Sequence, residues 1–78
     1  MSRRDLGVLA IERTWGTAPT ALEQKLIDAD RELGLDARGY ALVVNGLIDD
    51  PAAFAHDPHT VAQLRATRDQ RRGGSQRC

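Results

Sequence analysis

The sequence predicts an all-α fold, a small bundle of about four helices that contains a helix-turn-helix and has a disordered C-terminal end. Three observations support this prediction. Apolar residues recur at helical spacing along most of the chain, and capping residues, glycines and prolines separate the periodic segments. A length of 78 residues is enough for one small domain only. We expect residues 1–72 to form that domain and residues 73–78 to form a flexible tail.

A first helix is predicted from Asp5 to Trp15, with Ser2 or Asp5 near its start. Val8, Ile11 and Trp15 stand at positions i, i+3 and i+7, so they share one face of that helix. The Gly-Thr-Ala-Pro segment that follows is typical of a short loop and ends the helix.

A second helix is predicted to begin near Ala21. Thr20 and Glu23 fit a capping box, in which the threonine oxygen accepts a free backbone N–H and the glutamate reaches back to the cap. Gly34 can adopt the left-handed conformation that closes many helices. The apolar stripe of this helix comprises Leu22, Leu26, Ala29 and Leu33.

Asp36 is a candidate N-cap for a third helix from Ala37 to about Asp49. Its apolar face would contain Tyr40, Val43, Val44, Leu47 and Ile48. The alternative is a β-hairpin, because an Asn-Gly pair at residues 45–46 favours a two-residue turn. The helix is the favoured interpretation, since the strands would be too short and the helical stripe is complete.

Two Asp-Pro pairs predict further helix starts, because aspartate can cap a helix and proline costs nothing at its first position. Pro51 should open a single turn that carries Phe54. Pro58 should open a fourth helix that ends at the Gly-Gly-Ser segment of residues 73–75. Its inward-facing residues are Val61 and Leu64.

Charge is divided unequally along the chain. Eleven basic and eleven acidic residues give a net charge of 0. Residues 1–64 carry six basic and ten acidic side chains, a net charge of −4, whereas residues 65–78 carry five basic and one acidic, a net charge of +4. The sequence therefore predicts a basic C-terminal arm that can bind phosphate, beside an acidic body that resists it.

The composition argues against several classes of protein. The only cysteine, Cys78, excludes an internal disulfide and a cysteine-based zinc site. No apolar run reaches the roughly 18 residues of a membrane span and no secretory signal is present, so we expect a cytoplasmic protein without a membrane partner. His56 and His59 have the spacing of a metal-chelating pair, but no further ligand is evident, and we interpret them as surface histidines.

Catalytic constellations are not evident in the sequence. It contains no discernible Ser/His/Asp set, glycine-rich phosphate loop or paired-carboxylate cleft. A core this small rarely encloses a substrate pocket. We therefore expect neither an enzyme nor a cofactor nor a small-molecule substrate.

The turn between the second and third helices resembles that of a helix-turn-helix. About three residues join the two helices, which favours a steep crossing. Gly34 is the turn glycine, and Asp30 departs from the motif, which prefers alanine there. The residues that match are Leu33 and Leu35 beside the glycine, Ala29 before it, and Tyr40 and Val43 after it. The alternative is that these residues form the core of a bundle with no nucleic-acid role.

Two segments resemble a family of short actinobacterial and actinophage proteins of unknown function. They are LAIERTW at residues 9–15 and YALVVNGLIDDPAAFAHDP at residues 40–58, and the resemblance covers roughly residues 6–72. It implies an all-helical, helix-turn-helix-like protein that is usually presumed to bind DNA, and it offers no established activity or catalytic residues to carry over. The resemblance also favours a structural role for Glu12 and Arg13, as a buried ion pair that holds the third helix, over a catalytic role. The alternative is that both side chains are exposed on the first helix.

Two departures from that family lower the positive charge of the third helix. The segment of residues 36–41 lacks one aromatic residue and places its arginine one position earlier. Asp50 stands where the family often has arginine.

We expect a small helix-turn-helix DNA-binding protein that is similar to a transcriptional regulator, with the third helix in the groove. Arg38 and Asn45 are expected to read bases and Tyr40 to contact phosphate. The arginines expected on phosphates are Arg65, Arg68, Arg71, Arg72 and Arg77. The alternative is a protein-interaction module, without DNA contact, that docks on a regulator or on transcription machinery through an acidic face; self-association is also open. That face comprises Glu23, Asp28, Asp30 and Glu32.

Overall fold

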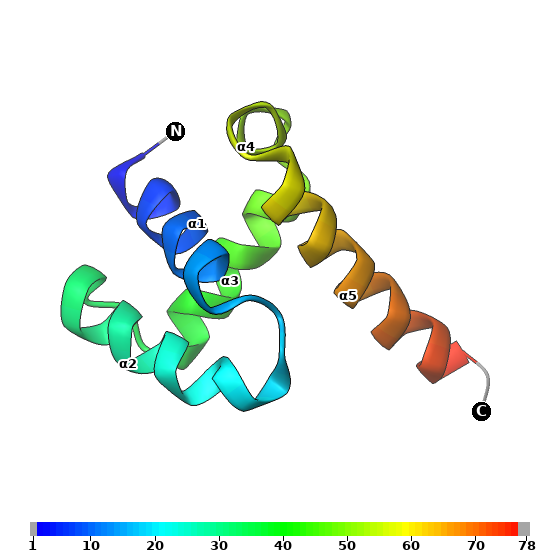
Figure 1. Ribbon diagram of the computed structural model, residues 1–78, viewed down its shortest axis with the longest axis horizontal. Helices are drawn as coiled ribbons and strands as arrows, with labels where there is room; N and C mark the ends of the chain where they lie inside the picture. The colour runs from blue at the N-terminus through cyan, green and yellow to red at the C-terminus, as the bar shows by residue number, and fades with distance from the viewer. Residues whose placement is uncertain (1, 77–78) are drawn as a thin grey trace.

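The structure is a computed structural model that describes the backbone of residues 2–76 and the side chains of residues 2–70. Every regular element in this part of the chain is helical (Figure 1), which confirms the all-α class and excludes the hairpin. The elements are α1 (Arg3–Trp15), a 3₁₀ turn η1 (Pro19–Ala21), α2 (Leu22–Leu33), α3 (Ala37–Ile48), α4 (Pro51–His56) and α5 (Pro58–Gln76). The short helix α4 is the single turn that was expected to carry Phe54.

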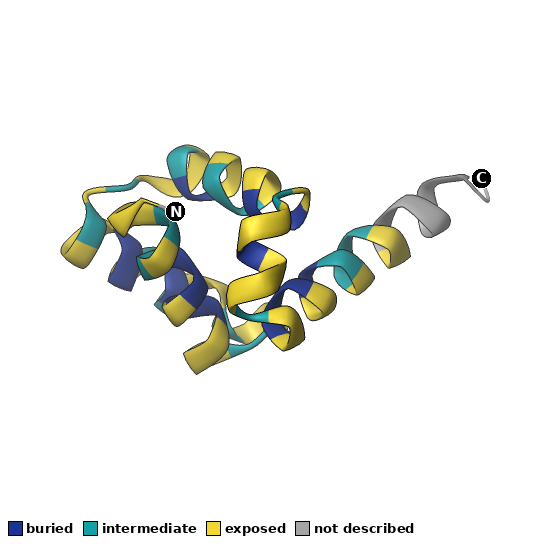
Figure 2. Cartoon of the chain, turned by 90° about the horizontal axis from the view of Figure 1, so that it is seen from above, coloured by how far each residue is buried: buried dark blue, intermediate teal, exposed yellow. Residues whose placement is uncertain are grey.

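The helices pack around α3. α1 contacts both α2 and α3, and α3 also contacts α4 and α5. The first half of α5 lies against this body, whereas the following turns extend away from it (Figures 1 and 2). The principal axes of the molecule measure 38 × 27 × 19 Å. Among the described helices, none combines the length and the apolar composition needed to cross a membrane.

Polar caps start four of the helices where the sequence predicts them. Each cap accepts a backbone N–H of the first helical turn, which would otherwise lack a partner. In α3, for example, Asp36 Oδ1 accepts the N–H of Gly39 at 2.7 Å. The four caps are Ser2, Asp36, Asp50 and Asp57.

Asp57 has a pKa below its ordinary value of 3.8. Desolvation raises the pKa, but the hydrogen bonds from Thr60 and the positive charges of Arg13 and His56 outweigh it. Because the folded pKa is the lower one, the stabilisation from this cap is present above about pH 4 and is lost as the pH falls through the folded pKa.

The capping box predicted for Thr20 and Glu23 is wrong. Pro19 opens the turn η1, which contains Thr20, and α2 begins after Ala21 without a side-chain cap. The N–H of Ala21 donates instead to the carbonyl of Ala18 at 3.0 Å. A backbone turn therefore supplies the partner that the sequence assigned to a side chain.

Gly34 closes α2 as predicted. Its φ of +67° lies in the left-handed region, where a side chain is strained. The N–H of Gly34 donates to the carbonyl of Asp30 at 3.1 Å, and the N–H of Leu35 donates to Ala29 at 3.2 Å. These two hydrogen bonds turn Leu35 back onto the core, and three residues separate α2 from α3.

The core is aliphatic apart from one tyrosine. Val61 and Leu64 face inward, as expected, whereas Trp15 and Leu22 are 40% and 52% exposed, contrary to their predicted stripes. The buried core cluster comprises Val8, Leu9, Ile11, Ala29, Tyr40, Leu47, Ala53 and Val61, and these residues lie on the inner faces of the helices (Figure 2).

α5 continues through its glycine pair to Gln76, so the helix end predicted at residues 73–75 is wrong. A glycine costs about 1 kcal/mol in a helix interior, and the hydrogen bonds of the adjoining turns can outweigh that penalty. Residues 77–78, with Arg77 and Cys78, lie outside the described part of the chain.

Candidate functional site

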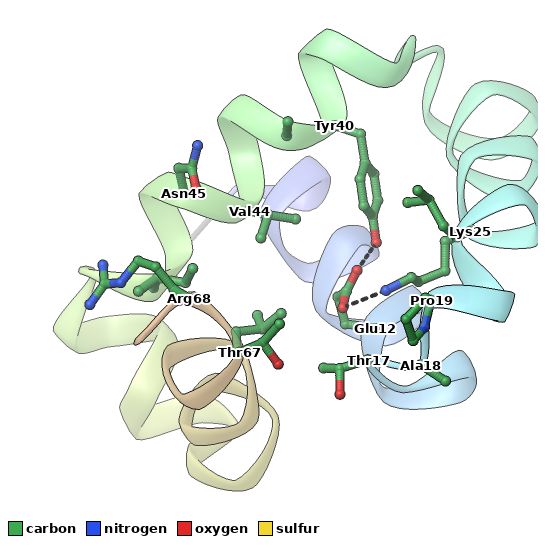
Figure 3. A pocket seen from close by; sticks show the side chains of 14 residues that line it. Glu12, Thr17, Ala18, Pro19, Lys25, Tyr40, Val44, Asn45, Thr67 and Arg68 are labelled. Carbon is green, nitrogen blue, oxygen red and sulfur yellow. Dashed lines mark hydrogen bonds and ion pairs between the residues drawn. The ribbon is translucent and has the colours of Figure 1, made fainter. Parts of the chain in front are cut away.

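A cluster of buried polar side chains joins α1, α2 and α3 (Figure 3). Glu12 of α1 is 3% exposed. Its Oε1 accepts a hydrogen bond from Lys25 Nζ of α2 at 3.1 Å, and its Oε2 accepts the hydroxyl hydrogen of Tyr40 of α3. Lys25 Nζ also donates to the carbonyl of Gly16 at 2.9 Å. The charges are paired and hydrogen-bonded, which is the condition under which burial of a charge is tolerated.

Tyr40 was expected to contact phosphate, and the structure contradicts this expectation. The residue is 4% exposed and its hydroxyl is bound to Glu12. Burial, followed by the hydrogen bond and the negative charge of Glu12, raises the pKa of Tyr40 well above its ordinary value of 10.0. Tyr40 therefore holds α3 against α1 and stays protonated.

The expected ion pair between Glu12 and Arg13 does not form. Neighbouring residues on a helix point in different directions, and Arg13 is exposed while Glu12 faces inward. The expectation that Glu12 grips the third helix is confirmed through Tyr40, and its cationic partner is Lys25.

A second group of polar contacts joins the C-terminal end of α1 to α2. Trp15 Nε1 donates to Asp28 Oδ2 at 2.8 Å, and Arg31 Nη2 lies 3.2 Å from Asp28 Oδ1. Asp28 is 9% exposed. The acidic face predicted for the second helix therefore loses Asp28, and its exposed members are Glu23, Asp30 and Glu32.

The exposed face of α3 carries the two residues that were expected to read bases. Arg38 and Asn45 are both exposed and stand two turns apart on the same side of the helix. Ala41 and Leu42 lie between them, and Leu42 is 67% exposed. This face is accessible along most of α3, with one cation, one amide and two apolar side chains.

Arg65 of α5 is bound to the C-terminal end of α3. Its Nε donates to the carbonyl of Ile48 at 2.9 Å, which gives a partner to one of the free carbonyls at the helix end. Its guanidinium also lies 4.8 Å from the ring centre of Phe54. Arg65 therefore has a structural role in joining α5 to α3 and α4.

Arg68 makes the next contact between α5 and α3. Its Nη1 lies 3.1 Å from Asp49 Oδ1, and its side chain is 32% exposed. Its Nε is buried without a hydrogen bond, 3.7 Å from Asp69 Oδ1. Asp49 was expected to repel a phosphate backbone, and Arg68 partly neutralises it.

A cleft of about 390 Å³ lies between α3, α5 and the segment that joins α1 to α2 (Figure 3). Glu12, Lys25 and Tyr40 meet at one end of it, and Asn45 and Arg68 lie together at the other. The cleft is open to solvent on one side and is not an enclosed pocket. It forms because α5 and the loop after α1 both line α3 without closing on each other.

The remaining predicted site residues and the two histidines differ in what the structure describes of them. The side chains of Arg71 and Arg72 lie outside the described part of the chain, as does Arg77. Within the described residues, no group of three or more His, Cys, Asp or Glu side chains could hold a metal ion. His59 Nε2 lies 3.3 Å from Gln63 Nε2 on the surface of α5.

The sequence model of a family described as "Protein of unknown function (DUF3263)" matches residues 1–76. No curated protein and no solved structure matches the chain. The resemblance noted from residues 9–15 and 40–58 is thus to a family of unknown function that covers nearly the whole sequence.

Proposed function

Because the chain belongs to the family described as "Protein of unknown function (DUF3263)", which carries no assigned activity, we propose its function from the geometry: it binds duplex DNA, with α3 in the major groove and α5 along the phosphates. α2 and α3 would then act as a helix-turn-helix in a binding protein that performs no catalytic step.

The observation that carries this proposal is the position of α5 at the C-terminal end of α3, where Asn45 lies. Asn45 of α3 and Arg68 of α5 line the same end of one cleft, so both can face one ligand surface (Figure 3). Had the arginines of α5 lain behind α3, one duplex could not reach both. The Arg68–Asp49 contact also lowers the repulsion that a phosphate would meet at the end of α3.

The chemistry of α3 suits a modest degree of base recognition. An arginine can bind guanine with two hydrogen bonds and an asparagine can bind adenine in the same way. Arg38 and Asn45 supply these groups, and the small or apolar residues between them, Ala41 and Leu42, can contact thymine methyl groups. The exposed acidic residues of α2, Glu23, Asp30 and Glu32, would limit the overall affinity.

An anisotropy titration of a labelled duplex pool with a randomised centre tests the role of α3. Arg38→Ala and Asn45→Ala should each weaken binding about tenfold to the duplexes that the wild-type chain selects from this pool. A tenfold loss is the effect expected for one base contact. Arg4→Ala is the matched control, because it removes an exposed arginine from the first turn of α1. Equal loss in all three variants, or no loss in the α3 variants, would contradict the proposed orientation.

A protein-interaction module is the second candidate function, and the exposure of Leu42 favours it. A side chain that is 67% exposed in the middle of the proposed recognition face is also what a protein partner would cover. A stoichiometric partner that is released by Leu42→Ser, together with no DNA binding at low salt, would select this candidate. Monomeric light scattering would exclude a symmetric mode with two half-sites.

A further inference from the structure

The cleft beside α3 has the dimensions and the lining of a small-ligand site. Its volume of about 390 Å³ falls within the range of about 300–1,000 Å³ that is typical of such sites. Leu22, Val44, Ile48 and Leu64 contribute apolar side chains to its lining, and Thr17 and Thr67 contribute hydroxyl groups between its two polar ends (Figure 3). A compact and mostly apolar molecule would fit this distribution.

Lys25 provides a hydrogen-bond donor at the inner end of the cleft. Its side chain is 9% exposed, and an ammonium group has three N–H donors. Two of them are bound, to Glu12 and to the carbonyl of Gly16. No other described residue accepts the third, so it is free to donate to an acceptor atom in the cleft.

The charge at this end selects the kind of acceptor. Glu12 already balances the charge of Lys25, and both of its carboxylate oxygens are occupied, by Lys25 and by Tyr40. A ligand carboxylate would therefore add a second negative charge close to Glu12. A neutral carbonyl or amide oxygen can accept the N–H without that repulsion.

We propose that the cleft between α3, α5 and the α1–α2 loop binds a compact, uncharged, largely apolar molecule whose carbonyl or amide oxygen accepts a hydrogen bond from Lys25. This inference goes beyond DNA binding and does not depend on it, because the cleft and its donor are present in the free protein. It replaces the expectation that the chain has no small-molecule ligand.

The test is an NMR titration of the isotope-labelled full chain with benzamide, benzoate and fluorobenzene. Benzamide carries a neutral acceptor, benzoate a charged one, and fluorobenzene has no carbonyl. Benzamide should shift the backbone amide signals of Thr17, Leu64 and Thr67 in a saturable way. Fluorobenzene should bind about tenfold more weakly, the loss expected for a missing hydrogen bond to a charged donor. Benzoate should also bind more weakly, because its negative charge is repelled by Glu12.

Two variants with a filled cleft locate the site. Val44→Phe fills one wall of the cleft and Ala18→Trp fills its rim from an exposed loop, so each should abolish the benzamide shifts. Leu6→Phe is the matched control, since it adds an aromatic ring to an exposed position of α1 outside the cleft lining. If Val44→Phe does not fold, Ala18→Trp decides the question.

Three results would overturn the proposal. They are the absence of shifts in the wild-type chain, unchanged benzamide binding in a folded cleft-filling variant, and benzoate or fluorobenzene binding as tightly as benzamide. None of these results bears on DNA affinity, so failure of the ligand site and failure of DNA binding are distinguishable.

Discussion

At the scale of single residues, two complementary pairs determine how α1 meets α2. Glu12 and Trp15 stand three positions apart on α1, and Lys25 and Asp28 stand three positions apart on α2. Each pair shares one helix face, so the carboxylate meets the ammonium and the indole N–H meets the second carboxylate. α2 is consequently rotated to bury Lys25 and Asp28, and Leu22 turns outward.

An apolar periodicity cannot identify this arrangement. The stripe of leucines in α2 predicts that Leu22 faces inward, because the sequence of one helix identifies its buried face only from the hydrophobicity of its residues. The buried face is decided by a partner helix that supplies matching charges. The i, i+3 spacing of polar residues on both helices was the available signal, and its use requires that the two helices are already known to be neighbours.

The first prediction concerns the ionisation of Tyr40, the only tyrosine in the chain. Because its pKa is raised in the folded state, the folded chain keeps a proton that the unfolded chain loses above its ordinary value of 10.0. The stabilisation from this group is therefore fully present below about pH 10 and is lost as the pH rises beyond it. Tyrosinate absorbance should not develop near pH 10 in the native protein and should appear together with unfolding.

An absorbance titration of the native chain with a midpoint near pH 10 would contradict the buried Tyr40–Glu12 contact. Tyr40→Phe is the companion variant. It should unfold at a lower urea concentration than the wild type, because Glu12 loses a hydrogen-bond partner. The expected loss in the free energy of unfolding is about 1–3 kcal/mol. Its stability should also decrease less steeply above pH 10 than that of the wild type.

The second prediction compares a buried and an exposed cation on α2. Lys25→Met leaves Glu12 as a buried charge without its cation and should lower the free energy of unfolding by about 3 kcal/mol or more. Arg31→Met removes a cation whose side chain is 70% exposed and should cost at most about 1 kcal/mol. Urea unfolding followed by circular dichroism measures both.

Adding Glu12→Gln to Lys25→Met should recover part of the loss, because the uncompensated charge is then removed. Equal costs for Lys25→Met and Arg31→Met would show that the Glu12–Lys25 pair is not buried in solution.

At the scale of helices, most boundaries follow from the sequence. Caps and glycine act through the backbone of the nearest turn, so their effect can be derived without tertiary contacts. Asp36 and Gly34 illustrate this, and both are confirmed. The two errors have another origin. At Thr20 a backbone turn competes with the side-chain cap, and in α5 the glycine penalty is too small to end an established helix.

The third prediction contrasts two glycines that differ in backbone conformation. Gly34 has a φ of +67°, and Gly34→Ala should destabilise the chain by about 1 kcal/mol although no atom lies within 4 Å of the added Cβ. Gly46 lies in α3 with equally open surroundings, and Gly46→Ala should stabilise by about 0.5–1 kcal/mol. Thermal or urea unfolding checks the opposite signs, and a shared sign would contradict the left-handed closure of α2.

At the scale of the whole molecule, the position of α5 relative to α3 determines the proposed site. The sequence shows that positive charge is concentrated after residue 64, but it does not indicate on which side of α3 these charges lie. The contacts of Arg65 with Ile48 and of Arg68 with Asp49 supply that direction. They hold α5 at the C-terminal end of α3, next to Asn45, and leave the cleft between α5 and the loop after α1.

Two of the sequence-predicted binding residues change role when the fold is known, since Tyr40 is buried and Arg65 binds the end of α3 within the molecule. Arg68 is paired with Asp49 but keeps about a third of its side chain exposed, so it remains a candidate for phosphate contact. Residue type and helix face alone could not separate these roles, because each depends on a contact between helices distant in sequence. Arg38 and Asn45 remain accessible, as the predicted face of the third helix requires.

The salt dependence of duplex binding tests the proposed function most directly. The logarithm of the association constant should fall linearly with the logarithm of salt concentration between about 50 and 200 mM, as counterions are released from phosphates. Arg38→Ala should leave this slope almost unchanged if Arg38 reads a base, whereas Arg68→Ala should reduce it by about one. No binding at about 50 mM salt, or an affinity that does not change over this range, would contradict DNA binding by α3 and α5.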